Sequence, residues 1–188
     1  MLGPHLISTV NQKVLSLLVK FSDREFYERE VARRLGISAG AANRALNGLF
    51  SSGAVRRRRE GRMYFYSVDP ANPVLTGFKK MVNIALIEPL VEDLKAVSNR
   101  VVLYGSCAQG TDTSESDMDL FVVSNNRDDA SGAVGDFTFP KGFEDVRIQA
   151  VIRTPVELLA AGEAEQAFMD EVEQGIVLWE RGAGEPGV

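Results

Sequence analysis

The chain has 188 residues, of which 45% are apolar, enough for one medium-sized domain or two small ones with a buried core. A single cysteine, Cys107, excludes an intramolecular disulfide, and the N-terminal sequence lacks the basic and apolar segments of a signal peptide. No apolar run reaches the length of a membrane span, so we expect a soluble, cytoplasmic protein without a membrane partner.

The net charge of −5 conceals two parts of opposite sign. Residues 1–69 carry 12 Lys and Arg against 6 Asp and Glu, whereas residues 70–188 carry 9 against 20. Two prolines, Pro70 and Pro73, mark the boundary. Such asymmetry indicates two domains with different partners. The expected division is a domain at 1–69, a connector helix at 70–85 and a second domain at 86–181.

The basic part shows three helical patterns followed by two strands. Gly36 is a helix stop, and Ser38 is a suitable N-cap for the helix that follows it. Glu60 and Gly61 separate two strand-like runs, which is typical of a hairpin. The expected elements are helices near residues 10–21, 27–35 and 38–51 and strands within 54–60 and 62–68.

The order helix, helix, turn, helix, hairpin resembles the winged helix-turn-helix family over roughly residues 8–69. The resemblance implies double-stranded DNA as a partner and a role in transcription regulation, with the third helix in the major groove and the hairpin wing along the backbone. Asn and Arg side chains have the donors that base edges and phosphates require. The DNA-contacting residues would be Ser38, Ala39, Asn43 and Arg44 on the third helix and Arg56, Arg57, Arg58, Arg59 and Arg62 on the wing.

Two features of the basic part leave alternatives open. A run of four arginines is also typical of a solvated surface, and strand alternation turns Arg56 and Arg58 away from Arg57 and Arg59. Winged helices also serve as dimerisation or protein-contact modules. The sequence therefore predicts a DNA-binding surface without specifying which arginines reach the duplex.

The connector begins with a strong helix-start signal. Asn72 is a favourable N-cap and Pro73 a favourable first helical residue. The helical pattern continues to about Val97, but Pro89 should start a new helix or kink this one. The apolar helix could pack on its own domain or pair with its counterpart in a homodimer.

The acidic part contains a motif between two strand-like runs. A Gly-Ser pair, Gly105 and Ser106, ends the first run, and Asp117 and Asp119 begin the second. Alternation places both aspartates on one face of the strand, where two carboxylates form a hard-cation site that suits magnesium. A Gly-Ser turn offers N–H groups and a hydroxyl to phosphates. The alternative is a solvated strand end with turn-forming aspartates.

The turn, the ten-residue spacing and the Ser-Asp-x-Asp-Leu run resemble the minimal nucleotidyltransferase branch of the DNA polymerase beta-like superfamily, over about residues 86–181. The resemblance implies an α+β chain whose second domain is a mixed sheet with helices on one side. It also implies metal binding and catalysis by Asp117 and Asp119, with Mg²⁺ or Mn²⁺, and triphosphate binding by Gly105 and Ser106. The implied reaction transfers a nucleotidyl group, usually AMP from ATP, to a hydroxyl of a protein or RNA.

The sequence departs from this family at two positions. The third carboxylate of the family falls on Gln149, a neutral residue, and Asp145 lies two residue pairs further along the same face. An arginine common in the branch is replaced by Gln109. Both changes weaken the expected metal and phosphate binding, so the second metal and the general base are missing from the pattern.

Two functions therefore remain from the sequence. The first is a DNA-binding protein with a magnesium-dependent nucleotidyltransferase activity, which the aspartate pair supports. The alternative is a transcriptional regulator whose nucleotidyltransferase-like domain is catalytically degenerate and senses a nucleotide, which Gln149 supports. We favour an enzyme.

Overall fold

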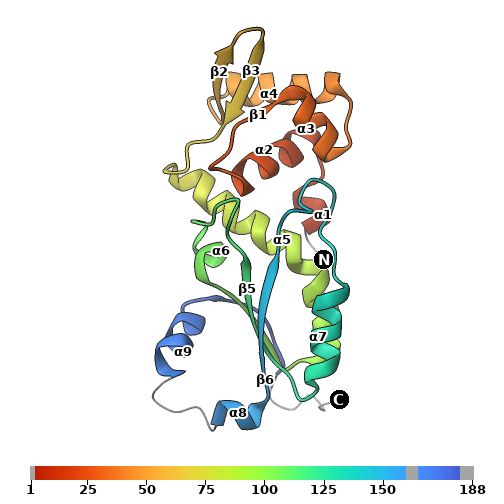
Figure 1. Cartoon of the computed structure of the whole chain (residues 1–188), viewed down its shortest axis with the longest axis vertical. Coiled ribbons are helices and arrows are strands. Elements are labelled where there is room, and N and C mark those ends of the chain that lie inside the picture. Colours follow the sequence, from red (N-terminus) through yellow and green to blue (C-terminus); the bar gives the residue numbers. More distant parts are fainter. Residues whose placement is uncertain (1–2, 160–164, 183–188) are drawn as a thin grey trace.

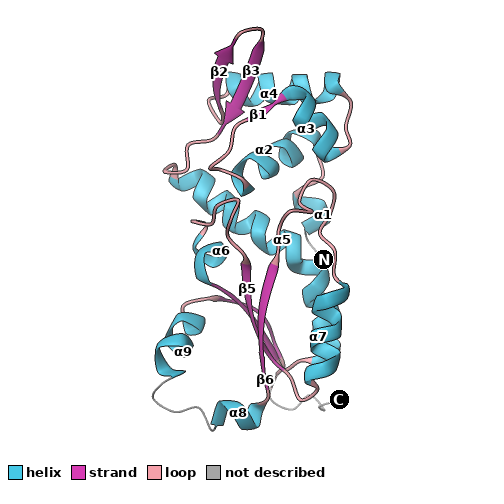
Figure 2. Ribbon diagram, in the orientation of Figure 1, coloured by secondary structure: helices cyan, strands magenta, loops and turns pink. Residues whose placement is uncertain are grey.

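The computed structural model describes residues 3–159 and 165–182 and has the α+β fold class expected from the sequence (Figure 1). A three-helix unit with a hairpin lies at one end, and a four-stranded sheet with its helices lies at the other. One long helix, α5 (Pro73–Val97), runs between them (Figure 2). The two parts are therefore joined by a continuous helix.

The N-terminal part has the winged helix-turn-helix arrangement. Strands β1 (Phe26–Tyr27), β2 (Arg56–Glu60) and β3 (Met63–Ser67) form an antiparallel sheet in the order β1-β3-β2. The helices are α1 (Gly3–Leu6), α2 (Val10–Lys20), α3 (Glu28–Leu35) and α4 (Ala39–Ser51). Helices α2, α3 and α4 bury a common apolar core that includes Leu17, Leu18, Val31 and Leu46, each at 0% exposure.

The end of α3 and the start of α4 are determined by the residues that the sequence predicts. Gly36 ends α3 with φ of 64°, in the left-handed region that favours glycine. The Ser38 side chain accepts the backbone N–H of Ala41 and so caps α4. Strand β1 was not expected, because two residues are too few to show an alternating pattern. It adds a third strand to the wing through Tyr66 and Phe65 of β3.

Of the two outcomes expected at Pro89, a new helix is excluded, because α5 continues through the proline to Val97. A proline inside a helix removes a hydrogen bond and costs about 3 kcal/mol. Leu86, Ile87 and Leu90 are buried on both sides of the proline, and each contributes about 1.5–3 kcal/mol. This burial offsets the cost. The α5 helix has 25 residues, yet no helix in the described part of the chain is both long and apolar enough to cross a membrane.

The C-terminal sheet is mixed and has the order β6-β5-β4-β7. Strands β5 (Met118–Val123) and β6 (Ile148–Arg153) are parallel, whereas β4 (Arg100–Tyr104) is antiparallel to β5 and to β7 (Ile176–Glu180). Helix α6 (Gly105–Gln109) follows β4 directly. Alternation along β4 and β5 sends successive side chains into two separate apolar clusters.

Helices cover both faces of this sheet, which differs from the one-sided arrangement implied by the family resemblance. Val101, Leu103 and Leu120 belong to the cluster shared with α5 and α7 (Arg127–Asp136). Tyr104 and Phe121 belong to the second cluster, with Phe168 of α9 (Gln166–Glu173). Helix α8 (Pro155–Leu159) adds Leu158 to that second cluster. Both faces offer apolar side chains, so both require a covering layer.

Candidate nucleotide site and nucleic-acid surface

The Gly-Ser turn and the aspartates meet where β4 passes into α6. Gly105 has φ of 66°, and a Cβ atom built there would lie 2.7 Å from Oδ2 of Asp119. A side chain at this position would therefore strain the backbone and displace the carboxylate. Ser106 is half-buried, and its hydroxyl makes no hydrogen bond to any other described residue. The turn thus places the Gly105 backbone beside the Asp119 carboxylate.

Asp119 belongs to β5, which lies between β4 and β6, and its side chain is on the face of the sheet that α9 covers. Its Cα pairs with Tyr104 of β4 and with Gln149 of β6. Burial, the charge of Asp117 and the charge of Glu171 all raise the pKa of the Asp119 carboxyl. A bound cation would relieve this penalty on the charged form. Glu171 could not be predicted from sequence, because only the packing of α9 brings its charge close to Asp119.

Asp117 is paired with an arginine. Nε of Arg147 lies 2.8 Å from Oδ1 of Asp117, and the Arg147 side chain is 70% exposed. The backbone N–H of Met118 also donates to the Arg147 carbonyl at 2.8 Å. Arg147 therefore forms a salt bridge with the first of the two aspartates in this structure. A cation at Asp117 would replace an exposed ion pair, which contributes little to stability.

The strand expected to carry the third carboxylate offers an exposed amide instead. Gln149 lies beside Asp119 in the parallel register of β5 and β6. Asp145 precedes β6 and forms an ion pair with NH2 of Arg34 at 2.6 Å. That pairing directs the Asp145 carboxylate to α3 of the winged helix. Asp145 therefore does not take the place of Gln149 in this structure.

The donor set fits one hard cation. Asp117 and Asp119 supply carboxylate oxygens, and magnesium commonly takes its other ligands from water and substrate phosphates. Among residues 3–159 and 165–182, no group of three or more acidic, histidine or cysteine side chains could hold a metal. A two-metal site would need at least one more carboxylate here. The residues thus suit a single cation bound together with a triphosphate.

The outer face of α4 carries the residues predicted to contact DNA. Ser38, Ala39, Asn43 and Arg44 are all exposed. Nδ2 of Asn43 donates to Oε2 of Glu28 at 2.5 Å, so this amide is held by a residue of α3. Arg44 makes no hydrogen bond or ion pair with any other described residue. The helix presents donors to solvent, as a recognition helix must.

The wing arginines differ in their surroundings, as strand alternation predicts. The Arg57 guanidinium lies 4.0 Å from the Phe50 ring centre and 4.4 Å from that of Tyr64, and it donates to Oδ1 of Asn47 at 3.1 Å. Phe50 and Asn47 belong to α4, so Arg57 connects the wing to that helix. Arg59 lies on the same side of the strand and donates to the Gly61 carbonyl.

Arg56 and Arg58 are paired with acids on the other side of the strand. NH2 of Arg56 lies 2.6 Å from Asp69, and Arg58 lies 2.7 Å from Glu25 and 2.6 Å from Glu60. These carboxylates neutralise part of the arginine run. Arg62 is exposed and has no ion pair with the described residues.

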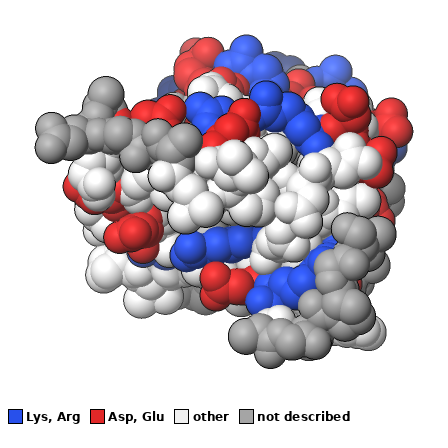
Figure 3. All heavy atoms as spheres, turned by 90° about the horizontal axis from the view of Figure 1, so that it is seen from below, with Lys and Arg blue, Asp and Glu red and all other residues white. Residues whose placement is uncertain are grey.

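At the end of the molecule away from the wing, basic and acidic side chains are interspersed around uncharged surface (Figure 3).

Comparison with known proteins agrees with the two-part fold. Residues 85–177 match the family model of the nucleotidyltransferase domain. This part of the chain therefore matches a nucleotidyltransferase domain, and it follows the winged helix-turn-helix arrangement described above. None of the curated proteins compared with the chain matches it.

Three solved structures resemble parts of the chain. Reduced HlyU from Vibrio cholerae has 25% identity and a TM-score of 0.33, and the match covers 44% of this chain and 77% of HlyU. The transcriptional regulator BldR from Sulfolobus solfataricus has 23% identity and a TM-score of 0.36, covering 46% of this chain and 63% of BldR. A candidate nucleotidyltransferase from Sulfolobus solfataricus has 19% identity and a TM-score of 0.36, and the match covers 56% of this chain and 87% of that protein.

Proposed function

We propose that the chain is a DNA-binding protein whose C-terminal domain binds a nucleoside triphosphate, with ATP as the first candidate, together with one Mg²⁺ or Mn²⁺. The observation that supports this most is the close approach of the Gly105 backbone to Asp119, which puts the Gly-Ser turn beside a half-buried carboxylate. The match of residues 85–177 to the nucleotidyltransferase domain supports the ligand class.

The proposed reaction is transfer of a nucleotidyl group, AMP in the case of ATP, to a hydroxyl of a protein or RNA. The acceptor oxygen forms a bond to the α-phosphorus, the bond to pyrophosphate breaks, and the hydroxyl proton passes to water or a nearby base. A bound cation would neutralise charge on the phosphates. Ser106 and the turn would hold the triphosphate, and Asp117 and Asp119 would hold the cation.

A second function is a transcriptional regulator that senses the nucleotide without transferring it. Gln149 favours this function, because the amide beside Asp119 can neither hold a second cation as a carboxylate does nor accept the acceptor's proton. Both functions require metal-dependent nucleotide binding, and only the first requires transfer. In either case the winged helix would bind duplex DNA and direct the domain to it.

Calorimetry with ATP tests the shared step. We expect binding in the presence of Mg²⁺ and its loss with a chelator. The double variant Asp117→Asn, Asp119→Asn should lose the metal dependence, whereas Asp128→Asn, which changes an exposed aspartate on α7, should behave like the wild type. Unchanged metal-nucleotide binding in the double variant would place the site elsewhere.

Incubation with α-labelled ATP, Mg²⁺ and cell lysate then separates the two functions. Labelled protein or RNA that depends on Asp117 and Asp119 supports transfer. Metal-dependent ATP binding without any labelled product supports the sensor. A product that still forms with the double aspartate variant would come from another enzyme in the lysate.

A further inference from the structure

The winged helix holds the loop that separates the Gly-Ser turn from the aspartates. This loop, residues 110–117, leaves α6 and enters β5. Asp23, just after α2, accepts two hydrogen bonds from Ser114 in the middle of the loop. The backbone N–H of Ser114 donates to Oδ1 at 2.8 Å, and the Ser114 hydroxyl donates to Oδ2 at 2.5 Å. One exposed carboxylate of the N-terminal part thus fixes both the backbone and the side chain of a loop residue.

A buried ion pair forms a second attachment. Nζ of Lys20, the last residue of α2, lies 2.8 Å from Oδ2 of Asp112 in the loop, and both residues are 1% exposed. The other oxygen, Oδ1, accepts the Nδ2 donor of Asn83 at 3.0 Å. Both carboxylate oxygens of Asp112 are therefore bonded to residues of α2 and α5. Buried charges are costly unless paired in this way, which leaves the loop a single favourable position.

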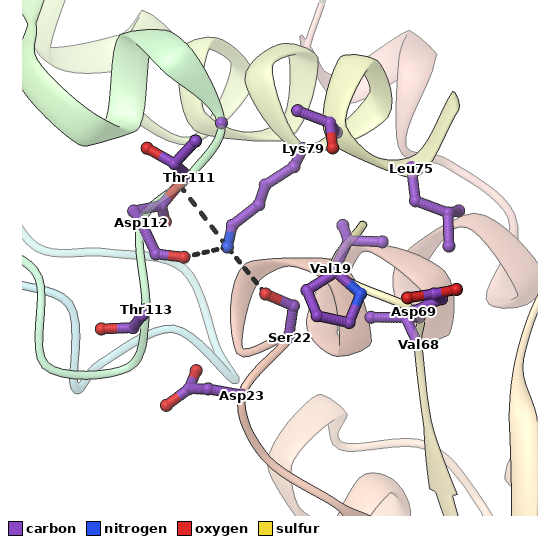
Figure 4. Close-up of a pocket in the computed structure, with 13 residues that line it drawn as sticks. Val19, Ser22, Asp23, Val68, Asp69, Leu75, Lys79, Thr111, Asp112 and Thr113 are labelled. Atoms are coloured by element: carbon purple, nitrogen blue, oxygen red, sulfur yellow. Dashed lines mark hydrogen bonds and ion pairs between the residues drawn. The ribbon is translucent and has the colours of Figure 1, made fainter. Parts of the chain in front are cut away.

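Lys79 of α5 completes the arrangement. Its amine points toward Ser22 of the winged helix and toward Asp112, and it bonds the Ser22 hydroxyl at 3.0 Å and the Asp112 carbonyl (Figure 4). Burial lowers the pKa of the Lys79 amine. These residues line a cavity of about 290 Å³ between the two parts. Loop 110–117 is thus one wall of the junction between the winged helix and the nucleotidyltransferase domain.

The same network reaches the nucleotide site. Nδ2 of Asn83 donates to the Cys107 carbonyl at 2.9 Å, directly after Ser106. The thiol of Cys107 donates to the Asp117 carbonyl at 3.5 Å, and Nζ of Lys20 lies 3.6 Å from the same sulfur. Lys20 therefore connects the winged helix with the backbone on both sides of the site.

We propose that Lys20 and Asp23 of the winged helix are positioning residues for the nucleotide site. They hold loop 110–117 so that the turn and the aspartates meet one ligand, and neither residue touches that ligand. The inference rests on the proposed function in that the ligand is a metal-bound nucleotide. It makes the winged helix a structural part of the nucleotide site as well as a DNA-binding unit.

The exposed contact between Asp23 and Ser114 can be tested without disturbing the buried Lys20–Asp112 pair. We expect Asp23→Ala to weaken Mg²⁺-ATP binding by about 3- to 10-fold in calorimetry, with a melting temperature close to that of the wild type. Asp23→Asn keeps an acceptor for the Ser114 N–H and should retain most of the affinity. Combining Asp23→Ala with Ser114→Ala should weaken binding no further than Asp23→Ala alone, because Asp23→Ala already removes the hydroxyl bond that Ser114→Ala deletes. Glu25→Ala removes a nearby acid that contacts the wing, and it should leave nucleotide affinity unchanged.

Hydrogen exchange of the full chain without nucleotide separates this inference from the proposed function. Faster exchange of the amides of residues 110–117 in Asp23→Ala, with unchanged exchange in α2, supports positioning. Equal exchange in variant and wild type would overturn it, as would unchanged nucleotide affinity in Asp23→Ala. If the wild type binds no nucleotide, the proposed function fails, and the exchange result alone decides whether Asp23 holds the loop.

Discussion

Gln149 lies directly beside Asp119 in the parallel pair of strands β5 and β6. The two side chains share the face that α9 covers, because residues in register on parallel strands point the same way. A neutral amide thus lies next to a carboxylate whose pKa is raised by burial and by the charges of Asp117 and Glu171. The chain keeps two of the three carboxylates implied by the family resemblance, and we predict that the missing one corresponds to this position.

Gln149→Asp should increase nucleotidyl transfer. The new carboxylate would face the cation site and could accept the acceptor's proton. A positioned general base contributes about two to four orders of magnitude in rate. The change adds a third negative charge to the site, so the metal-free protein should melt at a slightly lower temperature and recover with Mg²⁺. Labelled ATP measures the transfer, and thermal unfolding measures the stability.

Gln149→Ala is the matched control, because it removes the amide without adding a charge. It should leave transfer at the wild-type level and should not make the melting temperature depend on Mg²⁺. A wild type that already transfers rapidly, with Gln149→Asp unchanged, would contradict the role of this position. Glu171 would then be the next residue to replace.

Asp119→Asn should stabilise the metal-free protein at pH 7. The folded-state pKa of Asp119 is raised above its ordinary value of 3.8, so the folded chain binds the proton more tightly than the unfolded chain. This contribution to stability is present below pH 3.8 and is lost as the pH rises through the folded-state pKa. The substitution removes that loss, so the melting temperature of the metal-free protein at pH 7 should rise.

Thermal unfolding of Asp119→Asn and of the wild type between pH 4 and 7 measures this effect. The difference in melting temperature should shrink as the pH falls. Asp128→Asn on α7, which is exposed, should show no such trend. A destabilised Asp119→Asn at pH 7 would mean that the ionised carboxylate makes favourable contacts that outweigh its burial.

Much of the fold was predictable because its boundaries depend on neighbouring residues. Ser38 and Asn72 cap helices through their own side chains, and Gly36 ends one through its own backbone. The sequence left two outcomes open at Pro89, and the buried residues around the proline, which keep the helix continuous, decide against a new helix. The two-residue strand β1 is defined by its partner β3, which the sequence does not place.

The candidate site divides in the same way. The Gly-Ser turn and the aspartate pair lie within fifteen residues, so their spacing could be read from the sequence. The pairs Lys20–Asp112 and Arg34–Asp145 join residues 92 and 111 positions apart. Such pairs leave no local pattern, and the opposite net charges of the two parts suggested only different partners. The contribution of the winged helix to the nucleotide site therefore required the structure.

Cys107 should resist alkylation in the folded protein. Burial raises the pKa of its thiol to about 11, so little thiolate exists at pH 8. Its side chain is 0% exposed, which also denies the reagent access. Iodoacetamide should modify the native chain far more slowly than the chain in denaturant, as measured by mass spectrometry. Rapid modification of the native chain would show that α6 opens readily, and Mg²⁺-ATP should then slow it.

The surroundings of the wing arginines predict unequal effects on DNA binding. Arg57 and Arg59 lie on one side of strand β2 without a carboxylate partner among the described residues, whereas Arg56 and Arg58 are paired with acids. Each phosphate contact adds about 0.9 to the slope of log affinity against log salt. The double variant Arg57→Gln, Arg59→Gln should therefore weaken duplex binding by the full-length chain and flatten the slope by up to about 2.

The matched control is Arg56→Gln with Arg58→Gln, which removes the same formal charge from the same strand. It should change the slope less, because Asp69, Glu25 and Glu60 already neutralise these arginines. Fluorescence anisotropy with a labelled duplex at several salt concentrations measures both variants. Equal slopes for the two pairs would mean that the duplex lies along the edge of the wing and displaces the acids. Absence of duplex binding at low salt would remove the DNA-binding role, because arginines without carboxylate partners on a wing attract a polyanion under those conditions.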